Sequence, residues 1–184
     1  MILLKLTSLF CGKELVWYYG NYKSQKKHIM TTNENLVEVL NDLVQINNDR
    51  IIGYEKAVEE VENIDVDLKA IFHKMADQSR KLKAALANCV ATLGGELAEG
   101  TTASGKIYRT WMGVRATFSG NDRQTALNSC EFGEDAAQRA YKEALASDAE
   151  MTTEVRQMIT DQKEELKTSH DVIKGMRDAN KAMS

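Results

Sequence analysis

Eight residues between Leu68 and Leu93 alternate in steps of four and three without a break, and this spacing constrains the fold strongly. They are Leu68, Phe72, Met75, Ser79, Leu82, Leu86, Cys89 and Leu93. Such spacing places all eight on one face of an α-helix. The sequence contains no proline and only 11 glycines, so few residues oppose helix formation. The chain is therefore predicted to be all-α.

Three further segments repeat this periodicity, so four long helices are expected. They are predicted over residues 34–62, 66–93, 122–147 and 151–182. The stripe of the first consists of Leu36, Leu40, Leu43, Asn47, Ile51, Tyr54, Val58 and Val61. Short turns make the first two helices antiparallel, and likewise the last two.

The connection between the second and third helices is long. Gly94 and Gly95 are expected to cap the second helix. Residues 96–121 follow, with a short amphipathic helix predicted over residues 104–118. A connection of this length need not reverse the chain, so the third helix can lie parallel to the second. A partner-binding or membrane-surface role for Trp111 and Phe118 is an alternative to packing on the bundle.

The N-terminal residues 1–29 do not share the pattern of the rest. Their apolar start is too short to span a membrane. Thr31 and Glu34 have the spacing of a helix capping box, which favours Met30 as the natural start. We therefore expect a poorly ordered extension over residues 1–29 and one bundle domain over residues 30–184.

Composition excludes some partners. A net charge of -3 gives no basic footprint for nucleic acid, and membrane contact is not expected. Cys89 and Cys130 fall on apolar helical stripes, which is typical of small core residues in a reducing cytoplasm. The chain is expected to be cytoplasmic and to form a homo-oligomer.

Each predicted helix carries a polar residue near its midpoint, which suggests one buried polar layer. Glu134 lies on a stripe with Cys130 and Ala137, and a buried carboxylate must be paired, protonated or bound to a metal. Pairs spaced by three residues in the second and fourth helices put two side chains on one helical face. The predicted layer consists of Asn47, Gln78, Lys81, Glu134, Gln162 and Glu165.

These positions resemble the ferritin-like four-helix bundles, over about residues 33–180. Within them the chain is similar to a bacterial family of unassigned function. The residues that carry this narrower resemblance are Leu40-Asn41-Asp42-Leu43, Gly94-Gly95, Gly133-Glu134-Asp135-Ala136, Tyr141, Asp161-Gln162-Lys163-Glu164-Glu165-Leu166-Lys167 and His170-Asp171. The resemblance implies a ferritin-like bundle with one long crossover that carries a short additional helix, and it implies no particular reaction.

Ferritin-like bundles hold two metal ions with one Glu from each of two helices and a Glu-x-x-His pair from each of the others. By this resemblance, Asn47 stands where the first helix has its ligand, seven residues before Tyr54. The two Glu-x-x-His pairs fall on Gln78 with Lys81 and on Gln162 with Glu165, while Glu134 retains its ligand type. The set is therefore a degenerate metal site.

Two hypotheses follow for the layer. In the first, Lys81 neutralises Glu134, Glu165 or both, and amides complete a protein-only network without a cofactor. In the second, Glu134 and Glu165 bind iron or manganese in a divergent, carboxylate-poor site with ferroxidase-like chemistry. No catalytic residue is identified, because no serine or cysteine has a base recognisable from the sequence. The sequence therefore favours a non-enzymatic ferritin-like bundle of unassigned role.

Overall fold

The computed structural model describes residues 12–61, 65–100 and 123–183. It contains α1 (Gly12–Glu60), α2 (Val66–Thr92), α4 (Arg123–Ala146) and α5 (Thr153–Met183). The described residues contain no strand. The expected all-α class is confirmed.

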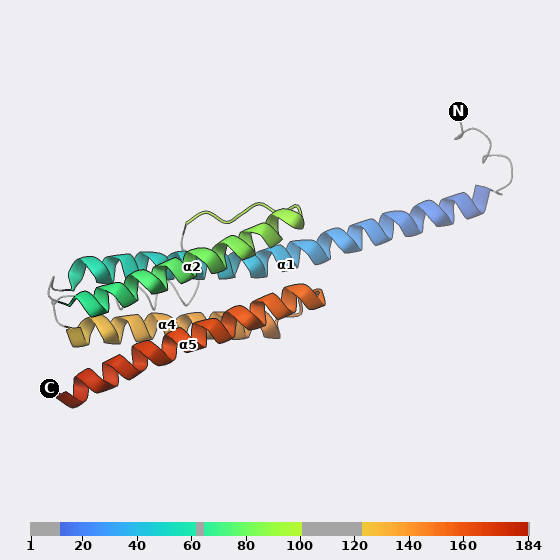
Figure 1. Cartoon of the computed structure of the whole chain (residues 1–184). Helices are drawn as coiled ribbons and strands as arrows, with labels where there is room; N and C mark the ends of the chain where they lie inside the picture. Colours follow the sequence, from blue (N-terminus) through green and yellow to red (C-terminus); the bar gives the residue numbers. More distant parts are fainter. Residues whose placement is uncertain (1–11, 62–64, 101–122, 184) are drawn as a thin grey trace.

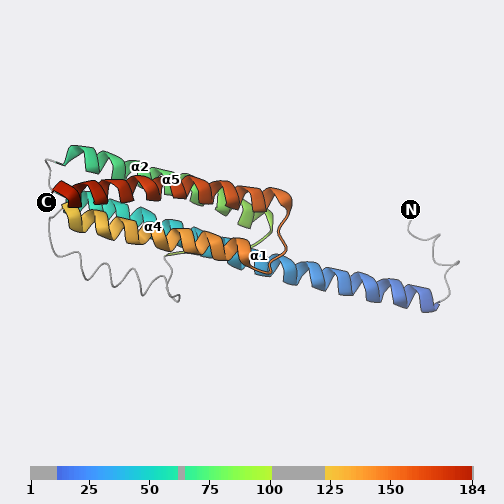
Figure 2. The same cartoon turned by 90° about the horizontal axis from the view of Figure 1, so that it is seen from below.

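The four helices form a bundle in which α1 packs against α2 and α4, and α5 packs against α4 and α2 (Figures 1 and 2). Neighbours along the chain are antiparallel, whereas α2 and α4 run in the same direction (Figure 1). The connection between α2 and α4 therefore crosses the length of the bundle, as predicted. The short helix expected over residues 104–118, with Trp111 and Phe118, lies outside the described residues.

The start of the first helix differs from the prediction. α1 begins at Gly12 and not near Glu34, so the capping-box spacing of Thr31 and Glu34 does not mark a helix end. No proline or glycine occurs between Gly20 and Gly53, and nothing in that stretch terminates a helix. Residues 12–29 are thus helical, and the separate N-terminal extension stays a prediction. The proposed domain boundary at residue 30 stays a prediction.

The end of α2 forms as its glycines predict. Gly94 has a φ of 75°, and the Gly95 amide donates to the Val90 carbonyl oxygen at 3.0 Å. This is the left-handed arrangement that glycine permits at the end of a helix. At the opposite end of the bundle, Arg123 at the start of α4 contacts Asp65, with 2.6 Å between Nη1 and Oδ1.

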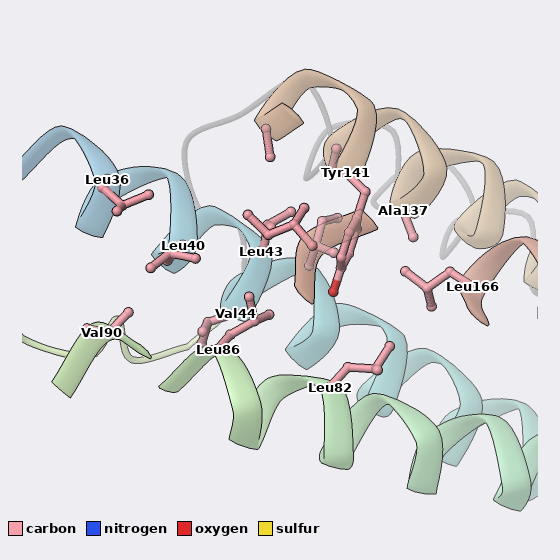
Figure 3. Close-up of a cluster of buried hydrophobic side chains, with 14 of the residues drawn as sticks. Leu36, Leu40, Leu43, Val44, Leu82, Leu86, Val90, Ala137, Tyr141 and Leu166 are labelled. Atoms are coloured by element: carbon pink, nitrogen blue, oxygen red, sulfur yellow. The ribbon is translucent and has the colours of Figure 1, made fainter. Parts of the chain in front are cut away.

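The apolar core is divided into two clusters along the bundle. The first surrounds Leu43, Leu86 and Tyr141, and Figure 3 shows Tyr141 of α4 reaching between the other helices. The second surrounds Tyr54, Phe72 and Leu127. On α1, residues 47–53 lie between the two clusters, and Asn47, Asp49 and Arg50 are buried there. A polar layer therefore separates the two halves of the core.

Candidate functional site

The centre of the polar layer is an ion pair between Arg50 of α1 and Glu134 of α4. Arg50 Nη2 lies 2.5 Å from Glu134 Oε1, and the two side chains are 1% and 0% exposed. The Tyr54 hydroxyl also donates to Glu134 Oε1. Because Arg50 and Tyr54 are four residues apart on one helix, α1 presents both donors to the same carboxylate oxygen.

Helix α2 supplies the other partners of the guanidinium. Arg50 Nη1 donates to Ser79 Oγ at 2.6 Å, and Arg50 Nη2 lies 3.4 Å from Gln78 Oε1. The Ser79 hydroxyl in turn donates to the Met75 carbonyl oxygen at 3.0 Å. The charge of Arg50 is thus balanced by Glu134 and solvated by side chains of a second helix, as a buried ion requires.

The electrostatics of these groups reinforce one another. Burial disfavours the charge on Arg50, but the neighbouring Glu134 favours it, and the net effect raises the Arg50 pKa above its ordinary value. Burial and then Glu134 raise the pKa of Tyr54 well above its ordinary value, so its hydroxyl keeps the proton that it donates. Burial and Glu134 also raise the pKa of the Cys130 thiol. Cys130 is therefore held as a thiol and is a poor nucleophile.

A second chain of hydrogen bonds begins one turn away on α1. Asn47 Nδ2 donates to the Tyr141 hydroxyl oxygen at 2.8 Å, and that hydroxyl donates to Gln162 Oε1 at 2.7 Å. Gln162 Nε2 then lies 3.3 Å from the Leu82 carbonyl oxygen on α2. All four helices are joined through these groups, and Tyr141 is the link at their centre.

The outer edge of the layer is formed by α2 and α5. Gln78 Nε2 donates to Glu165 Oε1 at 3.0 Å, and the Ser169 hydroxyl donates to Gln78 Oε1 at 2.8 Å. Gln78 is half-buried and Glu165 is exposed. Glu165 is thus connected to the ion pair only indirectly among the described contacts, through Gln78 and Arg50.

The structure therefore places the six predicted layer residues unequally. Asn47, Glu134 and Gln162 are buried, and Gln78 is at the edge of the layer. The predicted role of Lys81 is wrong, because its side chain is exposed and Arg50 neutralises Glu134 instead. Lys81 follows the buried Ser79 by two residues, which is roughly 200° around the helix. Glu165 was also expected to be buried, and this too is wrong.

The sequence reasoning missed Arg50, Ser79 as a hydrogen-bonding partner, and Ser169. The sequence does contain a pattern that places Arg50 on a buried face. A second stripe on this helix has spacings of three and four residues as regular as those of the stripe through Ile51, and it consists of Asn47, Arg50, Tyr54, Ala57 and Val61. Arg50 is 1% exposed, whereas Ile51 is only half-buried.

The donor set does not fit the pair of metal ions that ferritin-like bundles hold. A guanidinium with a fixed positive charge lies against Glu134, the carboxylate at the centre of the layer. The second candidate ligand, Glu165, is exposed. Within the described part of the chain, no group of three or more His, Cys, Asp and Glu side chains is arranged to bind a metal ion.

Three buried polar atoms have no hydrogen-bond partner among the described residues: Asn47 Oδ1, Arg50 Nε and Glu134 Oε2. Arg50 and Glu134 also line a cavity of about 10 Å³, together with Gly53, Cys130 and Gly133. This volume is the size that one water molecule needs.

The raised pKa values of Tyr54 and Tyr141 lead to a titration prediction. Both phenols bind their protons more tightly in the folded state, mainly because they are buried. The stability they contribute is fully present below the unfolded pKa of about 10 and is lost as the pH rises through the folded values. Of the six tyrosines, two are therefore expected to ionise only when the chain unfolds at alkaline pH.

Near-ultraviolet absorbance of tyrosinate, followed with circular dichroism, checks this prediction. Tyr54→Phe and Tyr141→Phe should each remove one tyrosine from the step that accompanies unfolding. Ionisation of all six tyrosines near pH 10 with the helical signal unchanged would contradict it.

Comparison with solved structures supports the architecture. A mutant of Dps1 from Mycobacterium smegmatis superimposes with a TM-score of 0.65 at 11% sequence identity. The match covers 80% of this chain and 97% of the Dps1 chain. Dps1 is a ferritin-like four-helix bundle, so the likeness establishes a ferritin-like fold for this chain.

Sequence comparisons give the family. A search of curated protein sequences found no significant match. None of the described helices combines the length and apolar composition required to cross a membrane. The family model described as "Domain of unknown function (DUF2383)" matches residues 35–147, which is more than half of the chain. The chain therefore belongs to the DUF2383 family, and its fold is that of the ferritin-like four-helix bundles.

Proposed function

We propose that this protein is a non-enzymatic ferritin-like bundle in which a buried salt-bridge network replaces the two metal ions of the fold. The observation that supports this is the position of Arg50, whose guanidinium lies against Glu134 in the interior of the bundle. A fixed positive charge repels a metal cation at this place, and hydrogen bonds from Tyr54 and to Ser79 and Gln78 complete the network.

The proposed role is architectural and needs no cofactor. Such a bundle presents four rigid helices to a partner, and we assign it a homo-oligomeric state. The buried thiol of Cys130 and the half-buried thiol of Cys89 are both free, which is consistent with a reducing, cytoplasmic compartment.

Metal analysis tests the proposal. Protein expressed in iron- and manganese-supplemented medium should contain no stoichiometric metal, and its melting temperature should not rise when either ion is added. A metal that binds the folded protein would stabilise it by about 2.7 kcal/mol when its free concentration is 100 times its Kd. A thermal melt detects a change of this size.

The matched variants are Glu134→Gln and Glu165→Gln, which keep shape and remove charge. The alternative is a divergent site for iron or manganese formed by Glu134 and Glu165. Stoichiometric metal in the wild type that disappears in both variants would establish that alternative and overturn the proposal.

A further inference from the structure

The N-terminal part of α1 extends beyond the rest of the molecule. α1 begins at Gly12, and its first residues project past the ends of α2, α4 and α5 (Figures 1 and 2). Residues 12–32 form a rod of roughly 30 Å. Most helical stability in proteins comes from tertiary packing, so the stability of this rod is expected to depend on packing against another surface.

A groove lies where this rod enters the bundle. It has a volume of about 720 Å³ and runs between α1 and the turn after α2. Four exposed carboxylates line it: Glu34, Glu38, Asp42 and Glu96. Partial burial, and then the neighbouring Glu38, raise the pKa of Asp42. A basic occupant would offset the negative charge of these two carboxylates.

The wall of the groove is firmly built. Asn41 Nδ2 donates to the Glu96 carbonyl oxygen at 2.9 Å, and the Ala98 amide donates to Asn41 Oδ1 at 2.9 Å. The turn lies so close to α1 that a Cβ at Gly95 would come within 2.6 Å of the Val37 side chain. The groove is thus a fixed feature of the bundle.

The projecting rod has the complementary charge. Successive spacings of four, seven, four and four residues separate Lys23, Lys27, Glu34, Glu38 and Asp42 along the chain. This spacing keeps all five positions on one face of a continuous helix. Two lysines therefore lie on one side of residue 32, and three carboxylates lie on the other side.

We propose that two copies of this chain associate through an antiparallel pairing of their α1 helices, with a two-fold axis near Thr32. In that register Lys27 of one copy lies opposite Glu38 of the other, and Lys23 lies opposite Asp42. The two-fold symmetry repeats each pair, because an isologous contact uses the same surface on both copies. The rod of each copy then follows the groove of its partner, which gives an interface to the proposed homo-oligomer on which this inference rests.

The groove also has an apolar part, because Val37 and Leu93 line it. Exposed ion pairs are individually weak and are screened by salt. The association is therefore expected to weaken as the ionic strength rises.

Charge reversal provides the test, with mass measured by light scattering after size-exclusion chromatography and by analytical ultracentrifugation. Lys23→Glu with Lys27→Glu, and separately Glu38→Lys with Asp42→Lys, should each weaken self-association by at least about 30-fold, since four favourable pairs become repulsive. A mixture of the two charge-reversed proteins should associate again, because each then meets the opposite charge. Lys74→Glu with Lys142→Glu is the matched control at exposed positions elsewhere and should behave as wild type.

Several outcomes would overturn the proposal. If either charge-reversed protein self-associates as strongly as the wild type, the copies assemble through another surface. That result keeps the oligomer and rejects this interface. A monomeric wild type rejects both. If the wild type is monomeric and binds phosphatidylserine vesicles only when Lys23 and Lys27 are present, the rod contacts a lipid surface instead. Metal content does not depend on this interface, so the network proposal is tested separately.

Discussion

Replacing Arg50 with methionine is expected to lower the free energy of unfolding by about 3–5 kcal/mol, because Glu134 is then left buried without its cation. Methionine fills much of the same volume, so the loss reports the charge more than a cavity. Urea denaturation followed by circular dichroism measures the effect. A loss of this size is a large share of the total free energy of unfolding of a domain of this length.

A double variant, Arg50→Met with Glu134→Leu, separates charge from packing. Replacing both members of a buried ion pair with apolar residues is often neutral, so the double variant should recover most of the stability that the single variant loses. The exposed cation Lys81 serves as the control, and Lys81→Met should change the free energy of unfolding by less than about 0.5 kcal/mol. Equal stability of Arg50→Met and Lys81→Met would refute the assignment of Arg50 as the buried counter-ion.

Tyr141→Phe is expected to cost about 1–3 kcal/mol, although it removes one oxygen atom. The Tyr141 hydroxyl accepts from Asn47 and donates to Gln162, and both amides are buried. Without the hydroxyl, the two amides lose a partner and pay the desolvation cost of unsatisfied polar groups. Denaturation in urea again provides the measurement.

Thr168→Ala removes a hydroxyl from the exposed face of α5 and is the matched control, with an expected change within about 0.5 kcal/mol. If Tyr141→Phe is as stable as wild type, the chain from Asn47 to Gln162 is not a stabilising link. Recovery in Tyr141→Phe with Asn47→Leu and Gln162→Leu would support the polar origin of the loss.

Much of the fold follows from apolar periodicity. The ranges 66–93 and 151–182 that this periodicity predicts agree closely with α2 and α5, since tertiary burial and helical geometry demand the same spacing. The start of α1 was predicted wrongly because the capping-box pattern of Thr31 and Glu34 also occurs inside helices. A sequence pattern at a possible helix end cannot exclude continuation when no residue opposes it.

The candidate site was harder to predict than the fold. Glu134 could be identified as buried, because its helix offers no other arrangement of the apolar stripe. Its partner Arg50 could not be identified from the sequence, because Arg50 and Ile51 both continue the helical spacing of α1. Hydrophobicity favours Ile51 as the buried residue of the two. Only the packing of α4 against α1 decides between them, and this contact joins residues 84 positions apart in the sequence.

The division of the core by a polar layer has a consequence for how the helices align. Leucine-rich faces tolerate sliding, because a shift by one turn replaces one apolar contact with another. Such a shift of α4 would bring Cys130 or Gln138 opposite Arg50 and leave the guanidinium without Glu134. The penalty for an unpaired buried charge far exceeds any difference between apolar contacts. The ion pair is therefore expected to select one sliding position for α1 and α4, and the apolar clusters then stabilise the position that it selects.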